Sequence, residues 1–128
     1  MKSNVKELWL KALRSDKYRF GKGVLHSKST GRTCCMGVLI DVLRKANLGP
    51  LIEEVEPETP PKGTKITAQR YQCLHERPVA ATLPSAVQDF VGLSDTEVDQ
   101  LYYLNDAQGA NYSEIANWIE THITGELS

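Results

Sequence analysis

The segment that most constrains the fold of this chain is CMGVLIDVLRKAN, at residues 35–47. Its apolar residues recur at helical spacing and extend around most of the circumference, a pattern that predicts a buried central helix. Two basic residues in its last turn, and the sequence Asn-Leu-Gly-Pro that begins at residue 47, predict where this helix ends. Its one carboxylate, Asp41, either pairs with another group inside the protein or lies on a solvent-exposed edge of the helix.

Shorter elements are predicted before and after this helix. Apolar residues at helical spacing predict further helices at about 4–15, 86–91, 94–105 and 111–123. The caps expected for the first, third and fourth of these are Ser3 or Asn4, Ser94 in a capping box with Glu97, and Asn111 or Ser113. Short strands are predicted at 24–27, 32–35, 65–68 and 71–76. The first two strands are expected to form an antiparallel hairpin with a basic rim.

These elements together predict one α+β domain over residues 1–128. Four to five helices are expected to pack around the central helix at about 35–47, beside a small antiparallel sheet or hairpin. Residues 49–64 carry four prolines and four glutamates, which predicts a long acidic loop. The polar tail, 124–128, is expected to fray.

The composition is that of an ordinary globular domain, with 41% hydrophobic and 24% charged residues among 128. No apolar run approaches the ~20 residues that cross a bilayer, and the first residues carry charges where a signal peptide would be apolar. We therefore expect a cytoplasmic protein without membrane contact.

Motifs for catalysis, metals and cofactors are absent from the sequence. The glycines at 21 and 23 do not continue into a dinucleotide-binding pattern, and no P-loop, zinc or hydrolase motif is present. The three cysteines, Cys34, Cys35 and Cys73, have neither disulfide nor zinc spacing and are expected to be reduced thiols that pack as small hydrophobes. The sequence thus predicts no metal, no cofactor, no catalytic residue and no enzymatic activity.

The net charge of −1 hides a strong asymmetry. Residues 1–45 contain eleven Lys or Arg and three acids, whereas residues 46–128 contain four basic and thirteen acidic residues. Such asymmetry points to a charged partner, unless the two halves neutralise each other within one fold or between the protomers of a homo-oligomer. A nucleic acid polymer is disfavoured as that partner, because the sequence pI of about 6.3 is low and the acidic half would repel it.

A small anionic ligand suits a local basic rim better than a polymer does. The cations expected to hold its phosphate are Arg14, Arg19, Lys22, Lys28 and Arg32. Tyr18, Phe20 and Tyr102 are candidates to stack on a base, and Asn105 and Asp106 to read ribose hydroxyls or base edges. The alternative interpretation is structural: Tyr102 belongs to the core, and Asn105 and Asp106 only close a helix.

The order of motifs along the chain resembles a family of small, largely uncharacterised proteins of tailed bacteriophages and prophages. The shared blocks are WLKALRS at 9–15, Tyr18, GKGVL at 21–25, CCMGVLID at 34–41, LP at 83–84, FVGL at 90–93, LYYLND at 101–106 and IANWIE at 115–120. The resemblance implies a phage accessory protein that acts on the host in the host cytoplasm. The hypothesis that follows is counter-defence by sequestering a nucleotide-derived host immune signal; the alternative is inhibition of a host enzyme or defence complex through a charged face.

Overall fold

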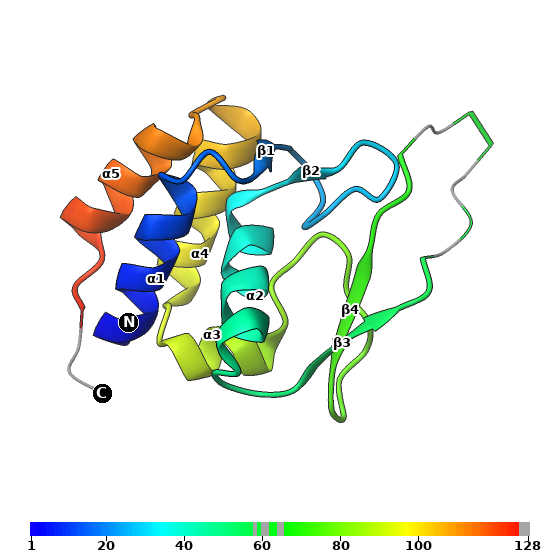
Figure 1. Cartoon of the computed structure of the whole chain (residues 1–128), viewed down its shortest axis with the longest axis horizontal. Coiled ribbons are helices and arrows are strands. Elements are labelled where there is room, and N and C mark those ends of the chain that lie inside the picture. The colour runs from blue at the N-terminus through cyan, green and yellow to red at the C-terminus, as the bar shows by residue number, and fades with distance from the viewer. Residues whose placement is uncertain (58, 60–61, 64–65, 126–128) are drawn as a thin grey trace.

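The computed structural model describes residues 1–57, 59, 62–63 and 66–125. It is an α+β fold in which helices gather on one side and a β-ribbon projects on the other (Figure 1). The elements are α1 (Ser3–Leu13), β1 (Arg19–Phe20), β2 (Arg32–Thr33), α2 (Cys35–Ala46), β3 (Ile52–Val55), β4 (Arg70–Cys73), α3 (Ser85–Val91), α4 (Asp95–Tyr102), the π-helical segment η1 (Tyr103–Ala107) and α5 (Tyr112–His122).

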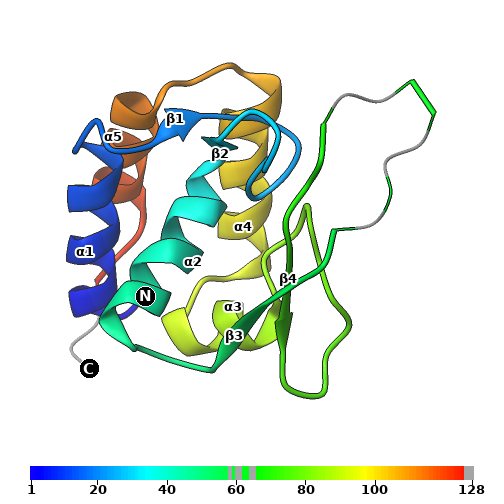
Figure 2. The ribbon, with the colours of Figure 1, turned by 45° about the vertical axis from the view of Figure 1, so that its right-hand side comes forward.

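Helix α2 is the centre of the core, as its sequence predicts. It lies between α1 and the β3–β4 ribbon (Figure 2), and its residues from Cys35 to Ile40 are all buried. Trp9, fully buried on α1, donates its indole N–H to the carbonyl of Cys35 at 2.9 Å. Gly37 permits a close approach, since a Cβ there would lie 2.0 Å from the carbonyl oxygen of Leu25. The helix ends at Asn47, whose left-handed φ of 53° closes it at the predicted point.

The helix boundaries and two of the three predicted caps are confirmed. Ser94 and Asn111 each form a complete capping box, at the starts of α4 and α5. The cap predicted for α1 is wrong, because the N-cap residue is Lys2 and no side chain caps that helix. The helix predicted over 94–105 also changes form, since its last part is the π-helical η1. This wider turn accompanies the inward placement of Asn105, which is fully buried.

The predicted hairpin of 24–27 with 32–35 is only partly right. An antiparallel bridge does join His26 to Thr33, but the strand that pairs with β2 is β1, in a parallel arrangement. Two long-range features explain the difference. The backbone N–H of Leu25 donates to the carbonyl of Ala80, and Gly21 lets β1 approach β2 where a Cβ would meet that of Arg32 at 2.9 Å.

The expected acidic loop 49–64 contains a strand. Within it, β3 pairs antiparallel with β4, with Ile52 opposite Cys73 and Val55 opposite Arg70. Ile52 is buried, whereas the two glutamates after it are exposed. The strand therefore contributes one buried apolar side chain to the core, next to charged residues.

The other predicted strands are shorter than expected. The strand predicted at 71–76 ends at Cys73, and His75 follows in a turn with a φ of 69°. At 65–68 only Ala68 takes part, in a single bridge to Ser27, and Lys65 lies outside the described residues. Of the predicted frayed tail, Thr124 and Gly125 are exposed, and 126–128 lie outside the described residues.

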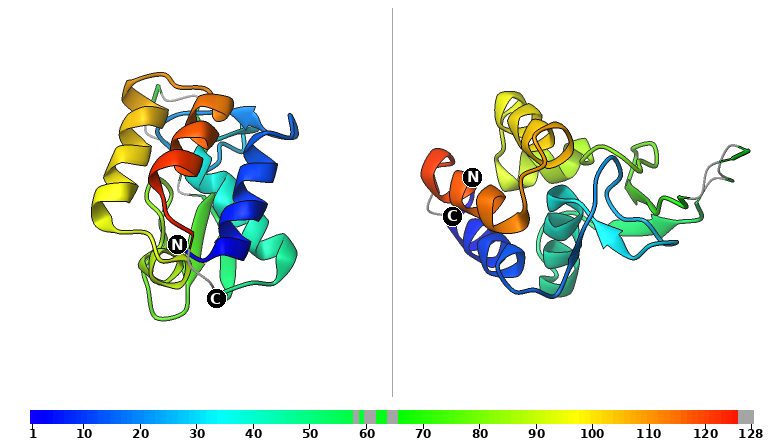
Figure 3. Two further views of the ribbon diagram at one scale, coloured as in Figure 1. Left: turned by 90° about the vertical axis from the view of Figure 1, so that its left-hand side faces the viewer. Right: turned by 90° about the horizontal axis from the view of Figure 1, so that it is seen from above.

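The start of α1 and the end of α5 lie side by side on the helical face (Figure 3). Helix α1 packs against both α2 and α5, so the first and last helices share one layer. The N-terminal ammonium group donates to the carbonyl of Thr124 at 3.2 Å. The side chain of Lys6 donates to the carbonyl of Ile123 at 2.5 Å, near the negative end of the α5 dipole.

Candidate functional site

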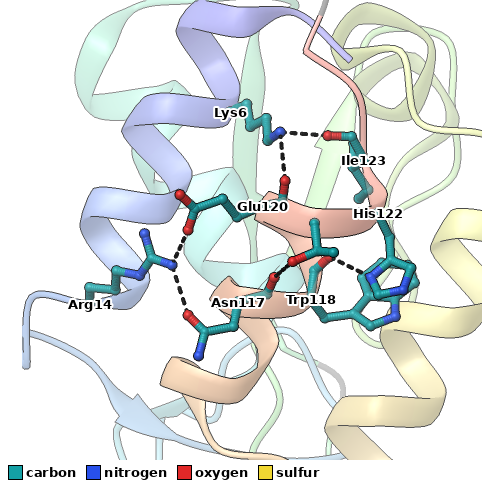
Figure 4. Close-up of polar contacts among 8 residues, drawn as sticks. Lys6, Arg14, Asn117, Trp118, Glu120, His122 and Ile123 are labelled. Carbon is teal, nitrogen blue, oxygen red and sulfur yellow. Dashed lines mark hydrogen bonds and ion pairs between the residues drawn. The ribbon is translucent and has the colours of Figure 1, made fainter.

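The charged halves of the chain partly neutralise each other inside the fold. Arg14 forms an ion pair with Glu120 at 2.5 Å and a hydrogen bond with Asn117 at 2.9 Å, both on α5 (Figure 4). Arg44 pairs with Glu54 across the start of the β3–β4 ribbon at 2.9 Å. Arg14, predicted to hold phosphate, is therefore engaged in joining α1 to α5.

The remaining predicted cations lie around the β1–β2 loop. Arg19, Lys22, Lys28 and Arg32 are all exposed, and none of them meets a carboxylate in the described part of the chain. The Arg19 guanidinium donates to the carbonyl of Thr30 at 3.3 Å, and that of Arg32 donates to the carbonyl of Phe20 at 3.2 Å. These contacts hold the two guanidinium groups near the loop without neutralising them.

Two of these cations border a hollow of about 380 Å³, here called the basic hollow. Its lining residues are Phe20, Gly21, Lys22, Val24, Ser27, Thr30, Arg32 and Ile66. The walls combine aromatic and aliphatic side chains with two cations, and no acidic residue is among them. Such a surface suits a ligand that joins an apolar body to a negative group. Lys28 and Arg19 do not line this hollow, although Arg19 reaches Thr30 at its margin.

Asn105 and Asp106 hold the β1–β2 loop against the start of α2. The Asn105 amide accepts from the backbone N–H of Cys35 at 3.1 Å and donates to the carbonyl of Gly21 at 2.9 Å. The Asp106 carboxylate accepts from the backbone N–H of Gly23 at 3.1 Å. Both residues thus position the loop that carries Lys22, and neither lines the basic hollow.

Two of the three predicted stacking residues, Tyr102 and Tyr18, have other partners, whereas the third, Phe20, lines the basic hollow. Tyr102 accepts a hydrogen bond from the backbone N–H of Leu83 at 2.6 Å, and burial raises the pKa of its phenol. The Tyr18 hydroxyl donates to the Asp41 carboxylate on α2, and burial together with that hydrogen bond raises the pKa of Tyr18. Neither ring lines the basic hollow. The aromatic side chain that does so is Phe20, packed edge-on against Tyr112 with ring centroids 5.3 Å apart.

A second hollow, of about 260 Å³ and here called the polar hollow, was not predicted from the sequence. It is lined by Lys17, Tyr18, His26, Gly31, Thr33, Gly37, Ile40, Asp41, Arg44, Glu54 and Tyr71. Along β2, Arg32 borders the basic hollow and Thr33 the polar hollow, because consecutive strand residues face opposite sides. Two of its lining residues are singled out in the sequence: Tyr18 as a ligand candidate, and Asp41 as the one carboxylate on an otherwise apolar helix.

We expect the variant Asp41→Asn to be less sensitive to acid than the wild-type protein. Burial acts to raise the pKa of Asp41, but hydrogen bonds from Lys45 and Tyr18 and the charge of Lys45 outweigh it and hold the pKa below its usual value. The ionised carboxylate therefore stabilises the fold above its unfolded pKa, and this stabilisation is lost as the pH falls through the lower folded pKa. Urea unfolding across the acid range would measure it.

Asp89→Asn is the matched control for this experiment, because Asp89 is exposed and forms no ion pair in the described part of the chain. Its unfolding free energy should follow the wild-type dependence on pH. Equal pH dependence in Asp41→Asn and wild type would contradict the role assigned to the Asp41 pairing.

The cysteines pack inside the protein as free thiols. Burial raises the pKa of Cys34 to about 11, and it raises the pKa of Cys35 as well. Cys34 contributes to the start of α2, where its sulfur accepts from the backbone N–H of Gly37 at 3.4 Å. Among the described residues, no cluster of three His, Cys, Asp or Glu side chains is arranged to hold a metal ion. No helix in the described ranges is long and apolar enough to span a bilayer.

The fold and these two of its hollows define a class: a small α+β domain in which a short β-loop on a buried central helix separates a basic hollow from a polar one. The chain belongs to the family described as Domain of unknown function (DUF8296), whose model matches residues 1–123. No curated protein and no solved structure matches it. The match runs from α1 to the end of α5, so both hollows lie within the family region.

Proposed function

We propose that this chain is a non-enzymatic binding protein that holds a small anionic, nucleotide-derived molecule in the basic hollow. The observation that carries the proposal is the hollow itself, which Lys22 and Arg32 line together with apolar side chains and which no carboxylate of the described residues lines. Cations without carboxylate partners form charge-assisted hydrogen bonds with phosphate at low desolvation cost, because they need not give up an internal ion pair.

The geometry narrows the class of ligand. Among the described residues, Lys22 and Arg32 alone supply positive charge at the lining, which suits one phosphate group better than a polyphosphate chain. Phe20, Val24 and Ile66 supply the apolar surface against which a base would lie. In the phage setting that the sequence resemblance implies, such binding would remove a host signal from the cytoplasm, a role in counter-defence.

The test is ligand-dependent thermal stability. Native mass spectrometry of freshly purified protein would detect a carried-over ligand, and thermal shift against nucleoside mono-, di- and cyclic phosphates would rank ligands. Binding of a monophosphate should raise the melting temperature. Lys22→Gln and Arg32→Gln should each weaken that binding about tenfold, the effect of one lost charge-assisted hydrogen bond.

Lys11→Gln is the matched control, because Lys11 is exposed on α1, lines neither hollow and makes the same change in net charge. It should bind the nucleotide as the wild-type protein does. A panel in which no nucleotide changes the melting temperature, or in which Lys11→Gln weakens binding as much as Lys22→Gln, would contradict the proposal.

A second candidate function, inhibition of a host protein, is favoured by one observation. Leu51 and Leu74 are 72% and 78% exposed, and together with Glu53 they line a hollow of about 220 Å³ beside the β3–β4 ribbon. Exposed aliphatic side chains next to acidic ones are typical of protein contact surfaces. If no small molecule binds, Leu51→Ser and Leu74→Ser are the variants with which to test a partner protein.

A further inference from the structure

The buried side chain of Tyr71 points to a second ligand. Tyr71 lies on β4 and is 6% exposed, and its hydroxyl group forms no hydrogen bond in the described part of the chain. No buried polar side-chain atom in that part of the chain lacks a partner, so the Tyr71 hydroxyl oxygen is accessible rather than sealed in the core. The residue lines the polar hollow. Burial and the charge of Glu54 raise its pKa to about 12, and Glu54 is itself a lining residue. A phenol that is buried on its ring and open at its hydroxyl offers one donor and one acceptor to whatever fills the hollow.

The charges around the polar hollow are already balanced. Asp41 is paired with Lys45 at 2.8 Å and accepts from Tyr18, while Glu54 is paired with Arg44 at 2.9 Å. An anionic ligand would meet these two carboxylates, and a cationic ligand would meet the cations that hold them. The four charged side chains of the lining also sum to zero, since Lys17 and Arg44 offset Asp41 and Glu54, so the lining favours a ligand of neither net charge.

Uncommitted polar atoms remain around the hollow. Within the described residues, the second oxygen of each carboxylate accepts no hydrogen bond, and the Lys17 ammonium forms no ion pair. His26 contacts the Thr33 hydroxyl through Nδ1 at 2.9 Å, which leaves Nε2 without a partner in the same part of the chain. Acceptors and donors thus face one small space. A hydroxyl group matches such a mixture, because it donates to a carboxylate and accepts from a phenol or an ammonium group.

We propose that the polar hollow is a second binding site, for an uncharged, hydroxyl-rich molecule of about monosaccharide size. Its volume of about 260 Å³ is below the range of about 300–1,000 Å³ that holds drug-sized ligands, so a single sugar ring or a comparable polyol fits it. The site shares no lining residue with the basic hollow. It therefore does not rest on the nucleotide proposal.

The experiment is an NMR titration of the full chain with neutral pentoses, hexoses and inositol as probes. Gly31 and Gly37 line the hollow, so their amide signals should shift in a saturable way, while the signal of the distant Gly125 stays in place. Charged analogues of similar size, ribose 5-phosphate and glucosamine, should shift these glycine signals less. Tyr71→Phe removes only the hydroxyl group and should weaken binding of the neutral probe about tenfold.

Tyr103→Phe is the matched control, since Tyr103 is 53% exposed and lines neither hollow. It should bind the neutral probe with wild-type affinity. Lys22→Gln should also leave this binding unchanged, which separates the result from the nucleotide test. The proposal is overturned if no neutral probe gives saturable shifts, if a charged analogue binds more tightly, or if Tyr71→Phe binds like the wild type.

Discussion

Replacing Asn105 with alanine should lower the free energy of unfolding by about 4 kcal/mol, a large share of the stability of a domain this size. Asn105 is fully buried and is shared between two backbone groups, the N–H of Cys35 at the start of α2 and the carbonyl of Gly21. Alanine would leave both without a partner and away from water, and each such group costs about 1–3 kcal/mol.

Urea unfolding followed by far-UV circular dichroism would measure this loss for Asn105→Ala. Gln108→Ala is the control, because Gln108 is exposed directly after η1 and should change stability by less than about 0.5 kcal/mol. A loss below about 1 kcal/mol in Asn105→Ala would show that water or a rearranged loop replaces the amide. The role of Asn105 as the clamp between α2 and the β1–β2 loop would then be wrong.

Gly37→Ala should be at least as disruptive. The added Cβ would lie 2.0 Å from the carbonyl oxygen of Leu25 and 2.7 Å from a methyl carbon of Thr33, and both are parts of the segment packed on α2. These atoms cannot yield locally, because the carbonyl of Leu25 also accepts from the backbone N–H of Cys34. We expect the loss of stability to exceed about 3 kcal/mol, at the upper end for overpacked sites.

The control for Gly37→Ala is Gly23→Ala. Gly23 has a φ of 80° and open space around its Cβ position, so alanine there costs only the backbone strain of about 1–2 kcal/mol. Thermal unfolding of both variants would compare a steric clash with backbone strain alone. If Gly37→Ala is as stable as Gly23→Ala, α2 can move away from Leu25 without a large loss of stability. The close contact between Gly37 and Leu25 would then not require glycine at position 37.

The helices could be predicted from the sequence because their signals are local. The apolar run at 35–47, the capping box at Ser94 and the cap at Asn111 each lie within a few residues of the structure they specify. The strands were predicted only in part, because their pairing depends on distant residues. Strand β1 pairs with β2 only because Gly21 allows the approach, and β3 lies among glutamates that hide its one buried residue, Ile52.

The residues of the candidate site could likewise be predicted where the signal is local, and not where it depends on distant residues. Lys22 and Arg32 were predicted from a basic stretch of sequence, and both border the basic hollow. Arg14 belongs to the same stretch, but its partner Glu120 is 106 residues away and could not be foreseen. The polar hollow was not predicted as a site, although Tyr18 and Asp41 were both singled out, because His26, Asp41 and Tyr71 come from three separate segments and carry no common spacing.

The contacts between the first and last helices affect how the chain can fold during synthesis. The bonds from Asn105 to Gly21 and from Lys6 to Ile123 span 84 and 117 residues, so they form only after nearly the whole chain is available. Contacts of such high sequence separation slow folding, since long loops must close before any interaction compensates their lost entropy. The basic N-terminal segment therefore emerges from the ribosome long before α5 exists to cover α1, and it remains without its final partner until α5 has been synthesised.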